Sequence, residues 1–228
     1  MSKAVVLLSG GLDSTTTLAY ALSKGYEVIP LTIGYGQRHS RELRSARAVA
    51  EHYRLRKHIT LDLDLSFLRT SALTSWDVSV PQHASVESIG NEIPVTYVPA
   101  RNIIMLSLAA SLCETEGGDS IFIGANAIDY SGYPDCRPEF FEAFQEVLRV
   151  GTKAGVEGRP IKVEAPILRM SKAEIVKLGK KLNAPLHLTW SCYNGGDKAC
   201  GHCDSCLLRL KGFQDAGCPD PVPYEGRQ

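Results

Sequence analysis

Short apolar segments alternate along the chain with longer segments in which apolar residues recur every three or four positions. The short segments are β-branched and bounded by Gly, Pro or charge, as buried strands are; they cover residues 4–8, 28–33, 59–63 and 120–123. The longer segments have the pattern of helices laid on a sheet; they cover residues 14–23, 41–52, 100–116, 140–150 and 172–182. This alternation predicts an α/β fold with a doubly wound, mostly parallel sheet.

Two stretches depart from the alternation. Residues 67–98 contain scattered Ser, Thr and Pro with weak periodicity, so we expect a long connection that passes over a functional site. The residues from Gly217 onward are rich in Pro, which predicts an extended tail.

Length and charge narrow the class of protein. The 228 residues suffice for one large core with a small appendage. Because 25 basic and 25 acidic residues balance, nothing predicts affinity for nucleic acid or an anionic membrane, and a small-molecule substrate is expected. The first apolar run stops after five residues, and no stretch reaches the roughly 18 apolar residues of a membrane span, so we expect a cytoplasmic protein.

A glycine-rich turn follows the first predicted strand. Residues 9–14 read SGGLDS, after which the pattern becomes helical. Free backbone N–H groups and the helix dipole make such a turn an anion site, and glycine lets a phosphate approach the backbone. An ordinary turn with Asp13 or Ser14 as the helix cap is the alternative for a lone Ser-Gly-Gly. No Walker A lysine and no GxGxxG pattern is present.

The full string resembles the signature of the PP-loop ATP pyrophosphatase superfamily. That resemblance implies cleavage of ATP between its α and β phosphates, with Mg²⁺ near the acidic residue. The nucleotide contacts it implies are Leu8, Ser9, Gly10, Gly11, Leu12, Asp13, Ser14 and Thr15. Gln37, after the second predicted strand, is a candidate contact for the base or ribose, and a simple turn is the equal alternative.

Four of the seven cysteines are crowded near the C-terminus. Cys192, Cys200, Cys203 and Cys206 follow the pattern C-x7-C-x2-C-x2-C, with glycines in the intervening turns. Four thiolates suit one structural Zn²⁺, although the C-x2-C-x2-C spacing also occurs in iron–sulfur sites. We therefore expect two parts, a nucleotide-binding domain over residues 1–185 and a zinc-binding segment over residues 186–228 with a helix at 204–213.

A third motif, DYSGYPDCR, occupies residues 129–137, after a predicted strand. Its acids, rings and arginine suit a flat heterocycle that bears a carboxylate, and a solvated turn is the alternative. The candidate substrate residues are Asp129, Tyr130, Ser131, Tyr133, Asp135 and Arg137. Cys136 is either a thioester-forming nucleophile or a packing residue, and packing is favoured.

Taken together, SGGLDS, VPARN at residues 98–102, DYSGYPDCR, LRMSKAEIVKLG at residues 168–179 and the cysteine cluster resemble the 7-cyano-7-deazaguanine synthase family of queuosine biosynthesis. The resemblance covers residues 4 to about 213. It implies a carbon–nitrogen ligase that converts 7-carboxy-7-deazaguanine, ammonia and ATP to the nitrile in two activations, and it suggests a homodimer.

Two cationic residues at predicted helix starts are assigned to the ATP site. Arg101 is expected to reach the nucleotide, and Lys172 to offset phosphate charge, with catalytic roles for Asp13, Ser14 and Lys172. Helix-end positions in solvent are the alternative for the two cations.

The other functional hypotheses are a PP-loop transfer-RNA thiolase or another adenylating enzyme, and a zinc-ribbon interaction module. The superfamily predicts AMP and pyrophosphate as products, whereas the family reaction is written with ADP and phosphate.

Overall fold

The computed structural model describes residues 2–37, 40–89, 92–128 and 133–226. Five strands form one parallel sheet in the order β3-β2-β1-β4-β5. They are β1 (Lys3–Leu7), β2 (Glu27–Gly34), β3 (Ile59–Asp62), β4 (Ser120–Phe122) and β5 (Lys162–Glu164). The predicted parallel sheet is confirmed, and β5 is an addition. It is a short edge strand with a charged residue at each end, so it lacks the apolar run that marked the others.

The helices begin and end within two residues of the predicted bounds. They are α1 (Leu12–Ser23), α2 (Arg41–His52), α3 (Arg101–Thr115), α4 (Pro138–Gly151), α6 (Lys172–Lys181) and α7 (Asp204–Asp215), with a short additional α5 (Lys153–Val156). α4 begins at Pro138, whose fixed φ suits the first turn of a helix.

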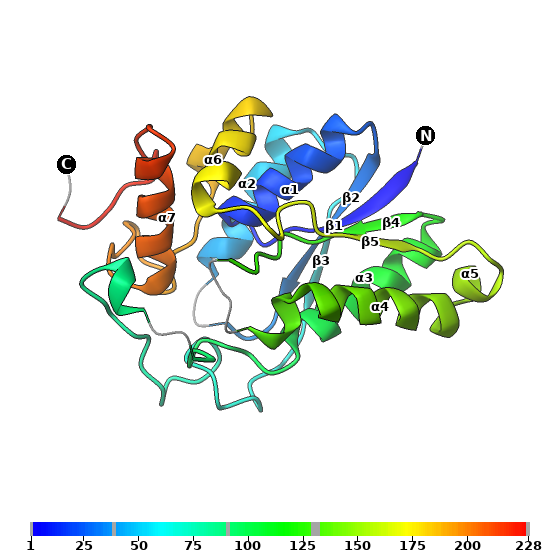
Figure 1. The fold of residues 1–228 in the computed structure, drawn as a ribbon, viewed down its shortest axis with the longest axis horizontal. Helices are drawn as coiled ribbons and strands as arrows, with labels where there is room; N and C mark the ends of the chain where they lie inside the picture. The colour runs from blue at the N-terminus through cyan, green and yellow to red at the C-terminus, as the bar shows by residue number, and fades with distance from the viewer. Residues whose placement is uncertain (1, 38–39, 90–91, 129–132, 227–228) are drawn as a thin grey trace.

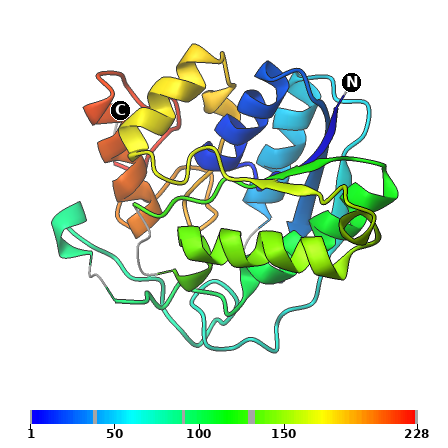
Figure 2. The same ribbon diagram turned by 45° about the vertical axis from the view of Figure 1, so that its right-hand side comes forward.

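Helices cover both faces of the sheet (Figures 1 and 2). Along β1, Val5 and Leu7 pack with residues of α3 and α4 such as Leu106 and Phe144. The alternate residue Val6 packs on the opposite face with Leu18 of α1 and others from α2. Because successive side chains of a strand point to opposite faces, one apolar strand supplies both cores.

The strand order places a crevice beside the end of β1. The chain leaves β1 toward β2 on one side, whereas β4 pairs with the other side of β1. Ligands of open α/β sheets bind at such a switch point, beyond the carboxyl ends of the strands. Gly124, after β4, lies so close to α1 that a Cβ there would be 2.8 Å from the Ser14 nitrogen.

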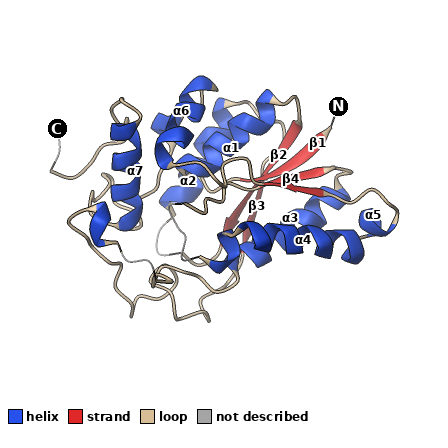
Figure 3. Cartoon of the chain, viewed as in Figure 1, coloured by secondary structure: helices blue, strands red, loops and turns tan. Residues whose placement is uncertain are grey.

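The predicted long connection is observed between β3 and α3. Among its described residues the only helical element is the 3₁₀ turn Val86–Ser88, and Figure 3 draws the rest of the described connection as loop. The C-terminal part continues from α6 into α7, and the two helices pack together. In the described part of the chain, no helix is long and apolar enough to cross a bilayer.

Candidate active site

The glycine loop connects β1 to α1 and packs tightly against α2. Gly10 has φ +83°, and a Cβ there would lie 2.4 Å from the Ala46 nitrogen, so only glycine fits. The Ser9 and Ser14 hydroxyls are 3.0 Å apart, and Ser14 Oγ donates to the Gly11 carbonyl at 3.2 Å. These bonds fix the loop at the start of α1, where the first N–H groups have no partner within the helix.

One pocket extends from this loop to the ends of β2 and β4 and to α3. The predicted site residues that line it are Leu8, Ser9, Gly11, Leu12, Asp13, Ser14, Gln37, Arg101, Tyr133, Cys136 and Lys172. Gly10 and Thr15 are buried beside it and are not part of its lining. The structure therefore brings the glycine loop, the first residue of α3 and part of the third motif to one cavity.

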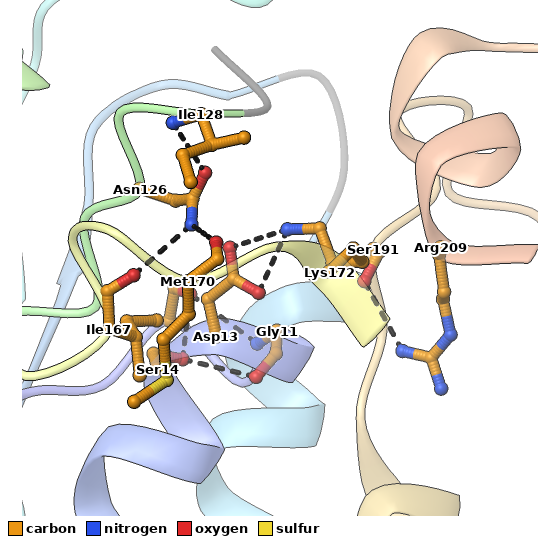
Figure 4. Close-up of polar contacts among 11 residues, drawn as sticks. Gly11, Asp13, Ser14, Asn126, Ile128, Ile167, Met170, Lys172, Ser191 and Arg209 are labelled. Atoms are coloured by element: carbon orange, nitrogen blue, oxygen red, sulfur yellow. Dashed lines mark hydrogen bonds and ion pairs between the residues drawn. The ribbon is translucent and has the colours of Figure 1, made fainter. Parts of the chain in front are cut away.

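Lys172 and Asp13 form an ion pair in the wall of this pocket. The Lys172 Nζ atom lies 3.0 and 2.9 Å from the two carboxylate oxygens of Asp13 (Figure 4). Only 9% of Lys172 is exposed, so its charge is largely removed from solvent. The pair places a cation beside the anion site of the glycine loop, where a Walker lysine would otherwise be needed.

Local capping and a buried amide position Lys172. Ser171 and Glu174 form a capping box at the start of α6, with Ser171 Oγ accepting from the Glu174 N–H. Asn126, beyond β4, donates from Nδ2 to the carbonyls of Ile167 and Met170 at 3.1 and 2.6 Å (Figure 4). Asn126 therefore ties the end of β4 to the segment that leads into Lys172.

Arg101 of the pocket lining lies among aromatic side chains and near the Glu42 carboxyl. The guanidinium of Arg101 lies 5.9 Å from the ring centroid of Tyr35. Burial raises the pKa of Tyr35 to about 12, so the phenol is neutral at physiological pH. Burial also raises the pKa of the Glu42 carboxyl to about 7, although the positive charge of Arg101 opposes that rise.

The third motif lies only partly within the described residues. Asp129, Tyr130 and Ser131 fall outside them. Tyr133 is buried, and its hydroxyl is 2.8 Å from Thr96 Oγ1. The carboxylate of Asp135 accepts from the Asn102 N–H at 2.9 Å and thereby caps α3. Arg137 is exposed before α4 and does not line the pocket.

Cys136 faces the pocket as a neutral thiol. Burial, together with the neighbouring Asp135, raises the pKa of Cys136 to about 11. The Asn102 side chain donates to Cys136 Sγ at 3.3 Å. A thiol with a raised pKa is a poor nucleophile, so this environment favours packing, the interpretation preferred from the sequence.

The four clustered cysteines form a buried ligand set. The Sγ atoms of Cys192, Cys200, Cys203 and Cys206 all lie within 4.8 Å of one another. The backbone N–H groups of Asn194 and Cys200 point at Cys192 Sγ at 3.4 Å, as donors to metal thiolates do. The donor set fits one tetrahedral metal ion with four sulfur ligands.

Arg209 of α7 connects this segment to the pocket and was missed from the sequence. Its guanidinium forms two bonds to Asp220, at 2.7 and 2.9 Å, and also donates to Thr189 and Ser191. Figure 4 shows Arg209 beside Ser191, on the opposite side of Ser191 from Lys172. The chain pattern carried no signal for Arg209, because its partners are brought together only by folding.

The whole chain is similar to one family of known proteins. Residues 3–217 match the family described as "Queuosine biosynthesis protein QueC". The chain belongs to this family. The 7-cyano-7-deazaguanine synthase of Acetivibrio thermocellus is 55% identical, with all of both chains covered. The synthase of Picrophilus torridus is 57% identical over 99% of this chain and 92% of its own.

Solved structures support the fold of this QueC family member. A 4-thiouridine synthetase bound to RNA and ATP matches 98% of this chain and 47% of its own, with a TM-score of 0.50 and 18% identity. The NMN synthetase of Francisella tularensis matches 96% of this chain and 78% of its own, with a TM-score of 0.50 and 15% identity. These likenesses concern the α/β architecture, and the predicted PP-loop fold is confirmed.

Proposed function

We propose that this chain is a carbon–nitrogen ligase that converts 7-carboxy-7-deazaguanine, ammonia and ATP to 7-cyano-7-deazaguanine. The observation that carries the proposal is the shared pocket of the glycine loop, the Asp13–Lys172 pair and the third motif. Full-length relatives named 7-cyano-7-deazaguanine synthase, at 55% and 57% identity, support it.

Activation is the first chemical requirement of this reaction. A carboxylate does not react with ammonia, because its oxygen is a poor leaving group. Attack of the carboxylate on ATP gives an acyl phosphate with release of ADP, or an acyl adenylate with release of pyrophosphate. Ammonia then attacks the acyl carbon, loses a proton and expels phosphate or AMP to give the amide. A second activation of the amide oxygen lets it leave as phosphate or AMP, which completes the nitrile.

The residues of the phosphate end bind and orient ATP in this proposal. The N–H groups at the start of α1 and the hydroxyls of Ser9 and Ser14 bind the phosphates, and Gly11 lets them approach. Gly10 lets the loop pack closely against α2. Lys172 balances the charge on the leaving phosphates. Leu8, Leu12 and the buried Thr15 shape the loop.

Two metal ions belong to the proposal, and the donor sets fit both. The oxygens of Asp13 at the pocket wall suit Mg²⁺, which would neutralise phosphate charge when bound with ATP. The four cysteines would hold one structural Zn²⁺, which leaves no open position for chemistry. The zinc-binding segment is proposed to begin at residue 186, after the ATP-binding domain.

For the substrate, we retain the assignment of Asp129, Tyr130, Ser131, Tyr133 and Asp135 as a proposal. Tyr133 lines the pocket, whereas Asp135 supports it through α3. We also propose a cytoplasmic homodimer that takes free ammonia and has no nucleic-acid partner, consistent with the balanced charge. Light scattering after gel filtration measures the oligomeric state.

Mass spectrometry tests the proposed reaction. The protein is incubated with Mg-ATP, ¹⁵N-ammonium and 7-carboxy-7-deazaguanine, and the heterocycle and adenine nucleotides are followed together. We expect a ¹⁵N-labelled nitrile, and AMP or ADP identifies the activated intermediate. An unchanged acid in the presence of bound ATP would overturn the proposal.

A further inference from the structure

In the proposed reaction the pocket must bind a carboxylate in the first activation and a neutral amide in the second. The acid substrate carries a negative charge on the group that reacts, whereas the amide and the nitrile are neutral at that position. A cation that contacts the reacting group therefore favours the acid over the amide. If the proposed function holds, one residue of the pocket supplies the cation that contacts the reacting group.

Arg137 was the sequence-based candidate, and its position is unfavourable. It is exposed, it precedes α4, and it is absent from the pocket lining. Lys172 is engaged by both oxygens of Asp13, and Arg209 is engaged by both oxygens of Asp220. Each of these two cations already has a carboxylate partner.

Arg101 lines the pocket without such a partner. Among the described residues, no carboxylate lies within ion-pair distance of Arg101; its neighbours are the phenols of Tyr35 and Tyr133 and the thiol of Cys136. The Glu42 carboxyl also lines the pocket and is influenced by the charge of Arg101, but burial raises its pKa to about 7, and these two described residues form no ion pair with each other. The carboxylate of Asp135, also nearby, is occupied by the Asn102 N–H. A guanidinium held near two phenol rings and without an ion-pair partner among the described residues is suited to a planar carboxylate, which it binds through two parallel hydrogen bonds.

The surroundings of Arg101 favour the heterocycle over the phosphates of ATP. The phosphate end has its own cation in Lys172 and the N-terminus of α1. Arg101 instead lies near the rings of Tyr35 and Tyr133 and the thiol of Cys136, and flat rings stack on surfaces of this kind. Arg101 also stands at the first position of α3, whose N-terminus adds positive potential.

We propose that Arg101 binds the reacting carboxylate of the acid substrate and is the residue that distinguishes the acid from the amide. Its guanidinium orients the carboxylate toward the glycine loop for the first activation. After the amide forms, the paired contact is lost, and the neutral group is free to turn its oxygen toward a second ATP.

Two alternative substrates test this assignment directly. Steady-state kinetics are measured for R101Q and R101K with 7-carboxy-7-deazaguanine plus ammonium, and separately with the corresponding amide, which needs only Mg-ATP. We expect R101Q to raise the KM for the acid about tenfold or more, as loss of a hydrogen bond to a charged group does, with the KM values for the amide and ATP close to wild type. R101K keeps the positive charge but loses the two parallel N–H donors of the guanidinium, so its KM for the acid should lie between those of the wild type and R101Q.

Several results would overturn the proposal. Equal rises in the KM values of R101Q for the acid and the amide would show that Arg101 does not distinguish the two substrates. A raised KM for ATP would show that Arg101 binds the nucleotide instead. If R137Q raises the KM for the acid and R101Q does not, Arg137 and not Arg101 binds the reacting carboxylate. A wild-type protein that makes no nitrile from either substrate would refute the proposed function itself, a result distinct from these.

A matched variant controls for loss of an arginine. Arg44 is exposed on α2 and does not line the pocket, so R44Q should match the wild type with both substrates. Circular dichroism and the melting temperature of R101Q and R101K establish that both variants fold. Changed acid kinetics in R44Q comparable to those of R101Q would also contradict the assignment.

Discussion

Gly212 of α7 lies against the side chain of Lys172. A Cβ at position 212 would be 2.4 Å from Lys172 Cγ and 2.8 Å from its Cβ. The helix that carries Cys206 of the cysteine cluster therefore supports the stem of the lysine whose Nζ atom contacts Asp13. The C-terminal segment is coupled to the ATP site by packing.

Replacing Gly212 by alanine should displace Lys172. The new methyl meets the inner atoms of the side chain, which cannot swing away as a flexible tip would, so overpacking should cost about 1–3 kcal/mol of unfolding free energy. Activity should fall as well, because Nζ moves from Asp13. In the control G151A, a Cβ meets nothing within 4 Å. Equal behaviour of both variants in denaturant melts and turnover assays would refute the coupling.

Asp13 should matter more for turnover than for stability. D13N keeps the size and one acceptor oxygen but removes the charge that binds Mg²⁺ and pairs with Lys172. We expect kcat to fall by about 100-fold or more, as for loss of a key electrostatic group, with the unfolding free energy changing by about 1 kcal/mol. D215N, which breaks an exposed ion pair with Lys211, serves as the control. Comparable losses in activity and stability would contradict the role of Asp13.

The cysteine cluster should contain one zinc ion per chain. Elemental analysis measures the metal, and chelation or C203S should lower the melting temperature and raise amide hydrogen exchange over residues 186–226. Cys218 is outside the cluster, so C218S should keep the metal. A brown protein with visible absorption would instead indicate an iron–sulfur cluster.

His83 should hold the long connection against the cysteine segment. Its backbone N–H donates to the His202 carbonyl at 3.0 Å, and its Nε2 lies 3.1 Å from the Asp204 carboxylate. H83A should therefore raise hydrogen exchange at residues 78–89 while the metal content stays unchanged. His187 is exposed, and H187A provides the comparison. Unchanged exchange in H83A would show that the side chain does not hold the loop.

His58 should make stability fall as the pH drops below neutrality. Burial, together with the charge of Arg47, lowers the pKa of His58 from 6.5. As the pH falls through about 6.5, the unfolded chain therefore takes up a proton that the folded chain resists, and the unfolding free energy decreases. H58Q lacks this contribution. From pH 7 to pH 5 the unfolding free energy of the wild type should therefore decrease relative to that of H58Q. A difference that is constant in urea melts over this range would contradict it.

The sequence alone was sufficient to predict the features that have local causes. Apolar periodicity identified four of the five strands and most helices, because burial on a sheet imposes that period on each segment separately. The SGGLDS turn and the cysteine spacing were likewise recognisable, since a phosphate loop and a four-thiolate site constrain neighbouring residues. β5 was not predicted, because a strand of three residues at the edge of a sheet needs no apolar run.

Tertiary structure alone decided how distant residues meet. The contact between Lys172 and Asp13 joins positions 159 residues apart, and no spacing rule predicts it. Folding also placed Arg101 in the pocket and Arg137 outside it, engaged Asp135 as a cap for α3 and set Gly212 against Lys172. The physical reason is that periodicity and turn chemistry act within a few residues, whereas these contacts depend on how whole helices pack across the sheet.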